Sequence, residues 1–332
     1  SFLGLVVLGA ANTNSTINVL AGGTASFQGQ LQLALSGAVL GQGSATINVD
    51  GAGANLSVVR QLVGTNVFGF ANGVVFLSDT PDGTANVNIR NGGRFTAFLL
   101  LHGIENSSAG PVNVNVESGG ALNLQSGALF GLGADGTTNL VVDGGAINVN
   151  TAAANAGFLD FGSGTGTTSN ITLRNGGTVS VVSGTGDGPG QVVFSNASGA
   201  TSTVNIESGS TFATQGSMFI STSLGASATI NLSGASTLTT RNDFIVASNG
   251  ADVTGSASVN LSGGSTLNTR FLVVSSAGSL TATNSTINAA VVDDLGAVAG
   301  NTGDIAINGT SALNLVGLAT STNTFVGDYS GV

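Results

Sequence analysis

Apolar and polar residues alternate along many short runs of this chain, and each run stops at a corner rich in glycine. In residues 46–50 the apolar Ile47 and Val49 alternate with polar neighbours. The same pattern recurs as NVNIR (86–90), TVNIE (203–207), TINLS (229–233) and SVNLS (258–262). A period of two residues is typical of strands with one buried face, whereas helical repeats need a period of about 3.6. The pattern therefore predicts an all-β protein.

The runs belong to a repeat, which is clearest in the three consecutive copies between Ser202 and Ser276. Each copy has an alternating run, a corner with glycine, a second alternating run and an apolar run that contains a Phe. The central residue of the first run forms a series along the chain: Asn18, Asn48, Asn88, Asn115, Val141, Thr172, Asn205, Asn231, Asn260, Thr281 and Ala306. Its steps vary in length and average about 29 residues, and internal periods of about 20–50 residues indicate solenoids, propellers or arrays.

Each unit of the repeat holds about three short runs, which predicts one coil of a parallel β-helix. A propeller blade would need about 40 residues and four antiparallel strands. We predict a single parallel β-helix (a β-solenoid) of about 11 coils, each with roughly 26–30 residues and three short strands. Right-handed winding is expected from the general preference of parallel crossovers. Residues 1–332 show no linker, so we expect one continuous domain, with an enlarged coil or loop near residues 60–82.

Stacked coils place equivalent residues of successive coils in rows. An asparagine between inward Ile, Val or Leu residues should point outward and form a ladder of stacked amides. We expect such a ladder at Asn205, Asn231 and Asn260. Phenylalanines recur at a nearly constant spacing and are expected to stack inside the solenoid: Phe194, Phe219, Phe244 and Phe271, with Phe130 and Phe158 continuing the row.

The composition narrows the classes of function. The chain has 53 Gly, no Cys and six basic residues, all Arg, and its 16 acidic residues give a net charge of -10. Such a chain is not expected to bind nucleic acid or anionic lipid, or to rely on disulfides. It has no apolar run of about 18 residues, so we expect no membrane-spanning helix. We interpret the apolar opening FLGLVVLGA as a strand of the repeat rather than as the core of a signal peptide.

Residues suited to catalysis are sparse. His102 is the single His and there is no Cys, so a nucleophilic triad has one candidate base and no thiol. His102 follows an apolar run and precedes a Gly, which favours a strand end or corner. Asp293 and Asp294 are adjacent and should point to opposite sides of a strand, while Asp79 and Asp82 have the setting of a turn. We expect no enzyme activity, no catalytic residue, and no cofactor or metal site.

The remaining charges fall at corners. Glu117, Asp143 and Glu207 occupy near-equivalent corner positions in different coils, and Arg90 and Arg174 share one corner position. This arrangement indicates solvated edges rather than a clustered site. Outward Thr residues in STLTT and STLNT suggest an ice-binding face, but the wide variation in coil length disfavours the regular lattice that such a face needs.

The segment FIVASNGADVTGSASVNLSGGSTLNT, residues 244–269, resembles the passenger repeats of autotransporters and related bacterial surface adhesins. In those repeats an apolar strand and a glycine corner precede a strand like VNLS and then GGSTL. The resemblance covers nearly the whole chain, and its low complexity marks architecture better than activity. It implies a secreted right-handed β-helix at the bacterial cell surface, which acts in adhesion, aggregation or biofilm. The family also has a signal peptide and a C-terminal membrane barrel, and we expect neither within residues 1–332.

Three functions follow as hypotheses. The first is a non-enzymatic extracellular structural or adhesive β-solenoid that self-associates, either by end-to-end stacking into a surface filament or matrix or by lateral association. The second is an adhesin passenger of a longer autotransporter, which binds host or neighbouring cells. The third, least favoured by the residues, is a glycan-active β-helix enzyme. The expected partners are the chain itself and cell-surface glycans or proteins. Specific function is expected where the repeat breaks, near residues 60–82, near residues 151–166, or at the two ends.

Overall fold

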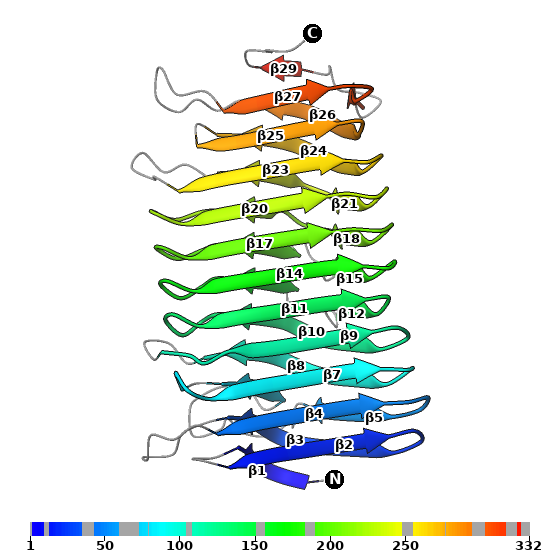
Figure 1. Ribbon diagram of the computed structural model, residues 1–332, viewed down its shortest axis with the longest axis vertical. Coiled ribbons are helices and arrows are strands. Elements are labelled where there is room, and N and C mark those ends of the chain that lie inside the picture. Colours follow the sequence, from blue (N-terminus) through cyan, green and yellow to red (C-terminus); the bar gives the residue numbers. More distant parts are fainter. Residues whose placement is uncertain are drawn as a thin grey trace.

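The chain winds into a right-handed parallel β-solenoid (Figure 1). Strands that face the viewer run from left to right as the chain rises from its N-terminus to its C-terminus, which makes the winding right-handed (Figure 1). Within its described residues the chain has 29 strands and no helix, so the all-β prediction is confirmed. The computed structural model describes residues 2–9, 13–34, 43–59, 73–78, 80–103, 108–150, 157–182, 190–247, 255–275, 277–293, 303–316 and 324–326.

One side of the solenoid is an 11-stranded sheet in which all neighbours are parallel. Its strands each carry the first run of a repeat, with the alternating burial that the sequence predicts. In order they are β2 (Asn14–Leu20), β4 (Ser44–Asp50), β7 (Thr84–Arg90), β9 (Val112–Glu117), β11 (Thr137–Asp143), β14 (Thr168–Arg174), β17 (Thr201–Ile206), β20 (Ser227–Leu232), β23 (Ser256–Ser262), β25 (Gly278–Thr283) and β27 (Asp304–Asn308).

An 18-stranded sheet forms the rest of the wall from the second and third runs. Its strands are β1 (Phe2–Leu8), β3 (Thr24–Leu33), β5 (Asn55–Val59), β6 (Val74–Leu77), β8 (Arg94–His102), β10 (Ala121–Phe130), β12 (Ala146–Asn150), β13 (Phe158–Phe161), β15 (Thr178–Val182), β16 (Gln191–Phe194), β18 (Thr211–Thr214), β19 (Met218–Ile220), β21 (Thr237–Thr240), β22 (Asp243–Val246), β24 (Thr266–Val274), β26 (Thr286–Asp293), β28 (Ala312–Leu315) and β29 (Thr324–Val326).

The coils vary in how many strands they contain. Middle coils, such as the one built from β14, β15 and β16, have the three short strands that the sequence predicts. In other coils the second and third runs join into one strand, as in β3 and β10, which have 10 residues each. The 11-stranded sheet contains one strand from each successive coil of the solenoid. Among the described strands, the end strands of the 11-stranded sheet, β2 and β27, each have a neighbour on one side only.

A single row of equivalent residues passes through the whole 11-stranded sheet. It is the series from Asn18 to Ala306, which we call the central column. Each member pairs with the next in parallel register, from Asn18 with Asn48 through to Thr281 with Ala306. The shortest and the longest steps of the series keep the same register, so differences in coil length are taken up outside these strands.

Glycine shapes the corner that follows the first strand of a coil. In the corner after β7, Asn91 and Gly92 have φ of 54° and 86°, the left-handed conformation that Asn and Gly adopt most readily. Gly93 comes next, and a Cβ at this position would collide with the carbonyl oxygen of Val49 in the coil below. The Asn-Gly-Gly corner therefore combines a tight turn with a close approach between two coils.

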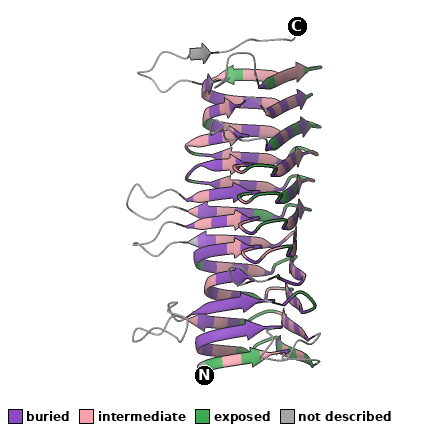
Figure 2. Ribbon diagram, turned by 90° about the vertical axis from the view of Figure 1, so that its left-hand side faces the viewer, coloured by how far each residue is buried: buried purple, intermediate pink, exposed green. Residues whose placement is uncertain are grey.

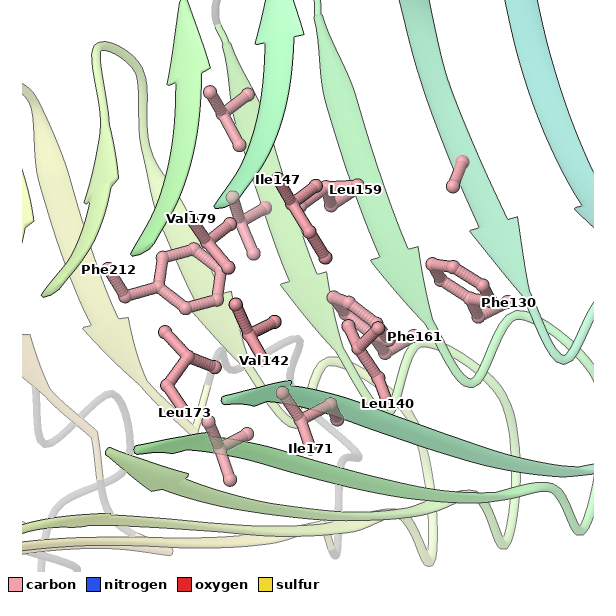
Figure 3. Packing of buried hydrophobic residues seen from close by; sticks show 14 of the residues in the cluster. Phe130, Leu140, Val142, Ile147, Leu159, Phe161, Ile171, Leu173, Val179 and Phe212 are labelled. Carbon is pink, nitrogen blue, oxygen red and sulfur yellow. The ribbon is translucent and has the colours of Figure 1, made fainter. Parts of the chain in front are cut away.

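The interior is one continuous cluster of buried apolar side chains, which extends from Val19 to Val292. Figure 3 shows how residues from both sheets meet there, with Leu140 and Ile171 from the 11-stranded sheet and Phe161 from the other. The rings of Phe130 and Phe161 stack with centroids 5.1 Å apart and an angle of 10° between their planes. Phe194 continues the stack at 5.3 Å and 9° from Phe161.

The predicted row of Phe194, Phe219, Phe244 and Phe271 does not form. Phe194 pairs with Ile220, while Phe219 pairs with Val193 and is partly exposed. Because successive residues of a strand point to opposite faces, this shift of one residue turns Phe219 outward. Phe271 is also partly exposed, and Phe244 is buried opposite Met218.

Of the two residues predicted to continue this row, Phe130 lies in the inner stack and Phe158 does not. Phe130 belongs to the inner stack, but the residue above it is Phe161. Phe158 pairs with Gly127 and is partly exposed. Phe130, Phe161 and Phe194 are therefore spaced more widely along the chain than the row that the sequence suggested.

The enlarged coil predicted near residues 60–82 falls mostly on residues 60–72 and 79, which lie outside the described part of the chain. Within the described part of this range, all four residues of β6 are buried. Val75 and Leu77 face the main core, and Val74 and Phe76 belong to a second small cluster on the other face. The division of residues 1–332 into one continuous domain stays a prediction.

The phenylalanine stack yields a stability test. We expect Phe161→Ala to lower the free energy of unfolding by about 3–5 kcal/mol, because the substitution leaves a cavity between two stacked rings. Phe158→Ala, at the start of the same strand, removes a partly exposed ring and should cost less than about 1 kcal/mol. Urea unfolding monitored by circular dichroism gives both values. Equal losses would contradict the assignment of Phe161 to the core stack.

Candidate functional site

The outward asparagines of the central column are bonded to one another. Asn231 Nδ2 donates to Asn205 Oδ1 at 2.9 Å, and Asn260 Nδ2 donates to Asn231 Oδ1 at 3.0 Å. A second part of the same column links Asn18, Asn48, Asn88 and Asn115 through bonds of 2.7, 2.9 and 2.9 Å. Each amide satisfies its neighbour, so these side chains serve the wall of the solenoid first.

Further amide ladders were not predicted from the sequence. They share the same geometry, in which a side-chain amide donates to the equivalent residue one coil earlier. Their members are Asn86, Asn113, Asn139 and Asn170; Asn123 and Asn148; and Asn268, Asn288 and Asn314. The signal was present for the first of them, because runs such as NVNIR carry a second Asn two positions before the central one.

Two corners carry an identical arrangement of charge. Arg90 Nε lies 2.9 Å from Asp50 Oδ2, and Asn91 Nδ2 donates to the other carboxyl oxygen at 2.8 Å. Arg174 and Asn175 hold Asp143 in the same way, with distances of 2.9 and 2.6 Å. The hydrogen bond from the asparagine, together with the arginine, lowers the pKa of each aspartate.

These corner charges form no clustered site. Glu117 pairs with Asp143 in register. Glu207 directly follows β17, which pairs with β14, and Arg174 is the last residue of β14. These corner charges therefore lie along one edge of the solenoid. The ion pairs are exposed, and pairs of this kind contribute little to stability. We interpret them as links between neighbouring corners.

His102 is the last residue of β8 and is fully buried. Its Nε2 donates to the carbonyl oxygen of Gly110 at 2.8 Å, and its Nδ1 accepts from Thr138 Oγ1 at 2.7 Å and from the backbone N–H of Gly131 at 3.3 Å. Burial lowers the pKa of His102 to about 4, so the ring is neutral at physiological pH. Both ring nitrogens are occupied by the protein, which leaves none for a substrate.

The other acidic residues singled out by the sequence also stand apart. Asp82 is exposed in a turn that is closed by a hydrogen bond from Gly83 N to Thr80 O. Asp79, Asp294 and the side chain of Asp293 lie outside the described residues.

Burial raises the pKa of Asp160 in β13, and a hydrogen bond from Asn196 Nδ2, 2.9 Å long, opposes that shift. Glycoside hydrolysis needs two carboxyl groups facing one bond, and the residues that pair with Asp160 in the adjacent coils are Leu129 and Val193.

The described side chains include no group of three His, Asp or Glu residues that could hold a metal ion. In the same part of the chain, no helix is long and apolar enough to cross a membrane.

The candidate binding site is an open hollow of about 470 Å³ on the outer face of the 18-stranded sheet. It lies at the corner that joins the second and third runs of successive coils, near the C-terminal end. We call it the Arg241–Arg270 hollow, and its lining residues are Thr240, Arg241, Asn242, Asn268, Thr269, Arg270, Asn288, Ala290 and Val316. It coincides with none of the breaks near residues 60–82 or 151–166.

Comparisons with known proteins identify no family. No family model matches the chain, and no curated protein matches it. The chain is similar to the crystal structure of a TibC-catalyzed hyper-glycosylated TibA55-350 fragment. The alignment covers 94% of this chain and 99% of the fragment. The two sequences are 16% identical and the TM-score is 0.25, a likeness that carries no argument about function.

The asparagine ladder can be tested with one substitution at two places. Asn231 both donates and accepts, so Asn231→Asp loses a donor and places a carboxylate oxygen against Asn205 Oδ1. We expect a loss of about 1–2 kcal/mol in the free energy of unfolding. Asn205 accepts a hydrogen bond without donating one among the described residues, so Asn205→Asp should have little effect. A similar loss in both variants would show that the added charge matters, not the ladder.

The buried imidazole predicts a dependence of stability on pH. A solvated His has a pKa of 6.5 and His102 one of about 4, so the unfolded chain binds this proton more tightly than the folded one. The contribution of His102 is therefore fully present above pH 6.5 and is lost as the pH falls toward about 4, by roughly 3 kcal/mol in total.

Urea unfolding at about pH 7 and about pH 4.5 checks this, with His102→Gln as the non-titrating comparison. The difference in stability between wild type and variant should shrink as the pH falls. Asp160 has a raised pKa and acts in the opposite direction, but it is present in both proteins and cancels in that difference. A difference that does not change with pH would contradict the prediction.

Proposed function

We propose that this chain is a non-enzymatic, extracellular structural or adhesive β-solenoid that associates with copies of itself end to end. The observation that carries the proposal is the position of its exposed large apolar side chains. Among the described residues there are five, and four of them belong to the two terminal coils. They are Leu5 (53% exposed), Val7 (43%) and Leu20 (62%) at one end and Val316 (52%) at the other.

The described strands at the same two ends pair on one side only. β1 and β2 begin the two sheets at the N-terminal end, and β27 and β28 lie at the C-terminal end. Figure 2 shows the exposed residues of the lowest strand in contrast to the buried interior of the coils above it. An edge of this kind is a template for pairing with a further strand.

The register of the coils suits such pairing. Ile305 and Ile307 flank the central column in β27, in the positions that Ile17 and Val19 occupy in β2. A first coil placed on a last coil therefore sets apolar residues on apolar residues, as every internal pair of coils does. Head-to-tail contacts between identical chains generate open filaments when their rotation does not close into a ring, and stacking along the solenoid axis is of the open kind.

The non-enzymatic part of the proposal is supported by the isolation of the titratable groups. His102 is enclosed by the protein, and the aspartates of the corners are engaged by Arg and Asn. The extracellular part is supported by the resemblance of residues 244–269 to passenger repeats of bacterial surface adhesins. In a passenger of a longer chain, further coils would cover the same end edges, and the lateral wall would be the binding surface.

Lysine substitutions at the two ends distinguish end-to-end association from contacts made through the lateral wall. We expect the wild-type chain to form oligomers or filaments whose length increases with protein concentration, as seen by light scattering and negative-stain electron microscopy. The double variant Val7→Lys, Val316→Lys should stay monomeric, because lysine on a strand edge opposes pairing. Leu224→Lys is the matched control, since Leu224 is 54% exposed in a lateral turn and not at an end.

Uniform monomers of the wild type at high concentration would overturn end-to-end association. Filaments formed equally well by the double variant would place the contact elsewhere on the molecule. Loss of association in Leu224→Lys would assign it to the lateral wall instead.

A further inference from the structure

We propose that the Arg241–Arg270 hollow binds an oxyanion group, a carboxylate or a sulfate, carried by a saccharide. The inference does not depend on end-to-end association, because both arginines lie on the lateral wall in coils that precede the last one; Val316 is the one lining residue that belongs to the terminal coil. It is carried by two arginines without a carboxylate partner in the described part of the chain, by the amides beside them, and by the irregular register that opens the hollow.

The hollow arises where one coil has an extra residue. Thr239 pairs with Asn268 and Asp243 pairs with Phe271, so four steps of the chain in one coil match three in the next. The surplus is absorbed at Asn242, whose carbonyl oxygen accepts from the backbone N–H groups of both Arg270 and Phe271 at 3.2 Å. An extra residue of this kind bends the strand locally and redirects its side chains.

The two arginines carry unneutralised charge. Arg241 and Arg270 are exposed and line the same hollow from adjacent coils. In the described part of the chain neither has a carboxylate within ion-pair distance, whereas Arg90 and Arg174 each have one. Asp243, two positions after Arg241, accepts instead from Ser217 Oγ at 3.1 Å.

Two like charges that line one hollow repel each other, and none of the described carboxylates pairs with either arginine, although the chain has a net charge of -10. An oxyanion placed between two guanidinium groups would relieve that repulsion through charge-assisted hydrogen bonds. The hollow therefore has the charge of an anion site on a protein that otherwise repels anions.

The rest of the lining suits a sugar. Asn288 Nδ2 donates to Asn268 Oδ1 at 2.8 Å, and each amide has a second N–H that the ladder does not use. Next to the lining, the partly exposed ring of Phe271 lies beneath Arg270, whose Cζ is 4.9 Å from the ring centroid. Ala290 and the half-exposed Val316 add apolar surface. Small-ligand sites combine apolar walls with a few oriented polar groups in this way.

Titration calorimetry with the full chain tests the site against four probes. Oligogalacturonate carries carboxylates, a heparin hexasaccharide carries sulfates as well, dextran is a neutral saccharide, and poly-glutamate is an acidic peptide. We expect binding of at least one charged saccharide, with affinity that falls as NaCl is raised from about 50 to about 300 mM. A preference between the first two probes identifies the oxyanion.

The variant Arg241→Gln, Arg270→Gln should weaken binding at least about tenfold, since it removes two charge-assisted bonds. Arg94→Gln is the matched control: Arg94 is also exposed in the 18-stranded sheet, without a carboxylate partner among the described residues, and its loss should leave the affinity unchanged. Arg241→Gln alone guards against lost packing, because Phe271 lies beneath Arg270 and not Arg241.

Several outcomes would overturn the proposal. They are no binding of either charged saccharide, equal binding of dextran, binding of poly-glutamate as tight as that of the saccharides, and unchanged affinity in the double variant. A loss of affinity in Arg94→Gln equal to that in the double variant would also overturn it, because binding would then follow the total charge of the chain.

Discussion

The parallel register between neighbouring coils is the constraint on which the rest of this structure depends. Each coil must lie over the previous one with equivalent residues paired, because a slip of one residue would exchange the buried and exposed faces of a strand. The central column shows the constraint in operation: ten pairings connect Asn18 to Ala306 without a slip. The continuous core and the amide ladders both follow from it, since each needs like positions to coincide.

The same constraint decides where the chain is free to vary. The step from Asn48 to Asn88 is nearly twice as long as that from Asn260 to Thr281, yet both pairs are in register. Additional residues therefore enter at corners, where they leave the ladders intact. The Arg241–Arg270 hollow is a small case of this freedom, because one surplus residue at a corner creates a recess that a uniform repeat would lack.

The features that the sequence predicts well are those that depend on the alternation of apolar and polar residues along a strand. The all-β class and the pairing of Asn205, Asn231 and Asn260 follow from period-two runs with a central Asn, since these runs have no competing register. The phenylalanine row was wrong because spacing along the chain does not reveal where a residue is gained between coils. Phe194 and Phe219 hold similar places in the repeated pattern, but the residue above Phe194 is Ile220, which follows Phe219.

The hollow could not be predicted for the same reason. Arg241 and Arg270 lie about one average step apart, and nothing in the linear pattern shows that a surplus residue beside them opens the wall. The setting of His102 was foreseen as a strand end, but its neutral, enclosed state depends on Thr138 and Gly110, which only the winding of the coils brings to it.

The direction of the asparagine ladders has a consequence for the molecule as a whole. In each described amide pair the donor belongs to the later coil and the acceptor to the earlier one, as in Asn48 to Asn18 and Asn314 to Asn288. The side-chain dipoles therefore add along the axis, with their positive ends toward the N-terminus, in the way that peptide dipoles add along an α-helix. The solenoid is thus an electrically polar rod, and two such rods lying side by side have lower electrostatic energy when they point in opposite directions.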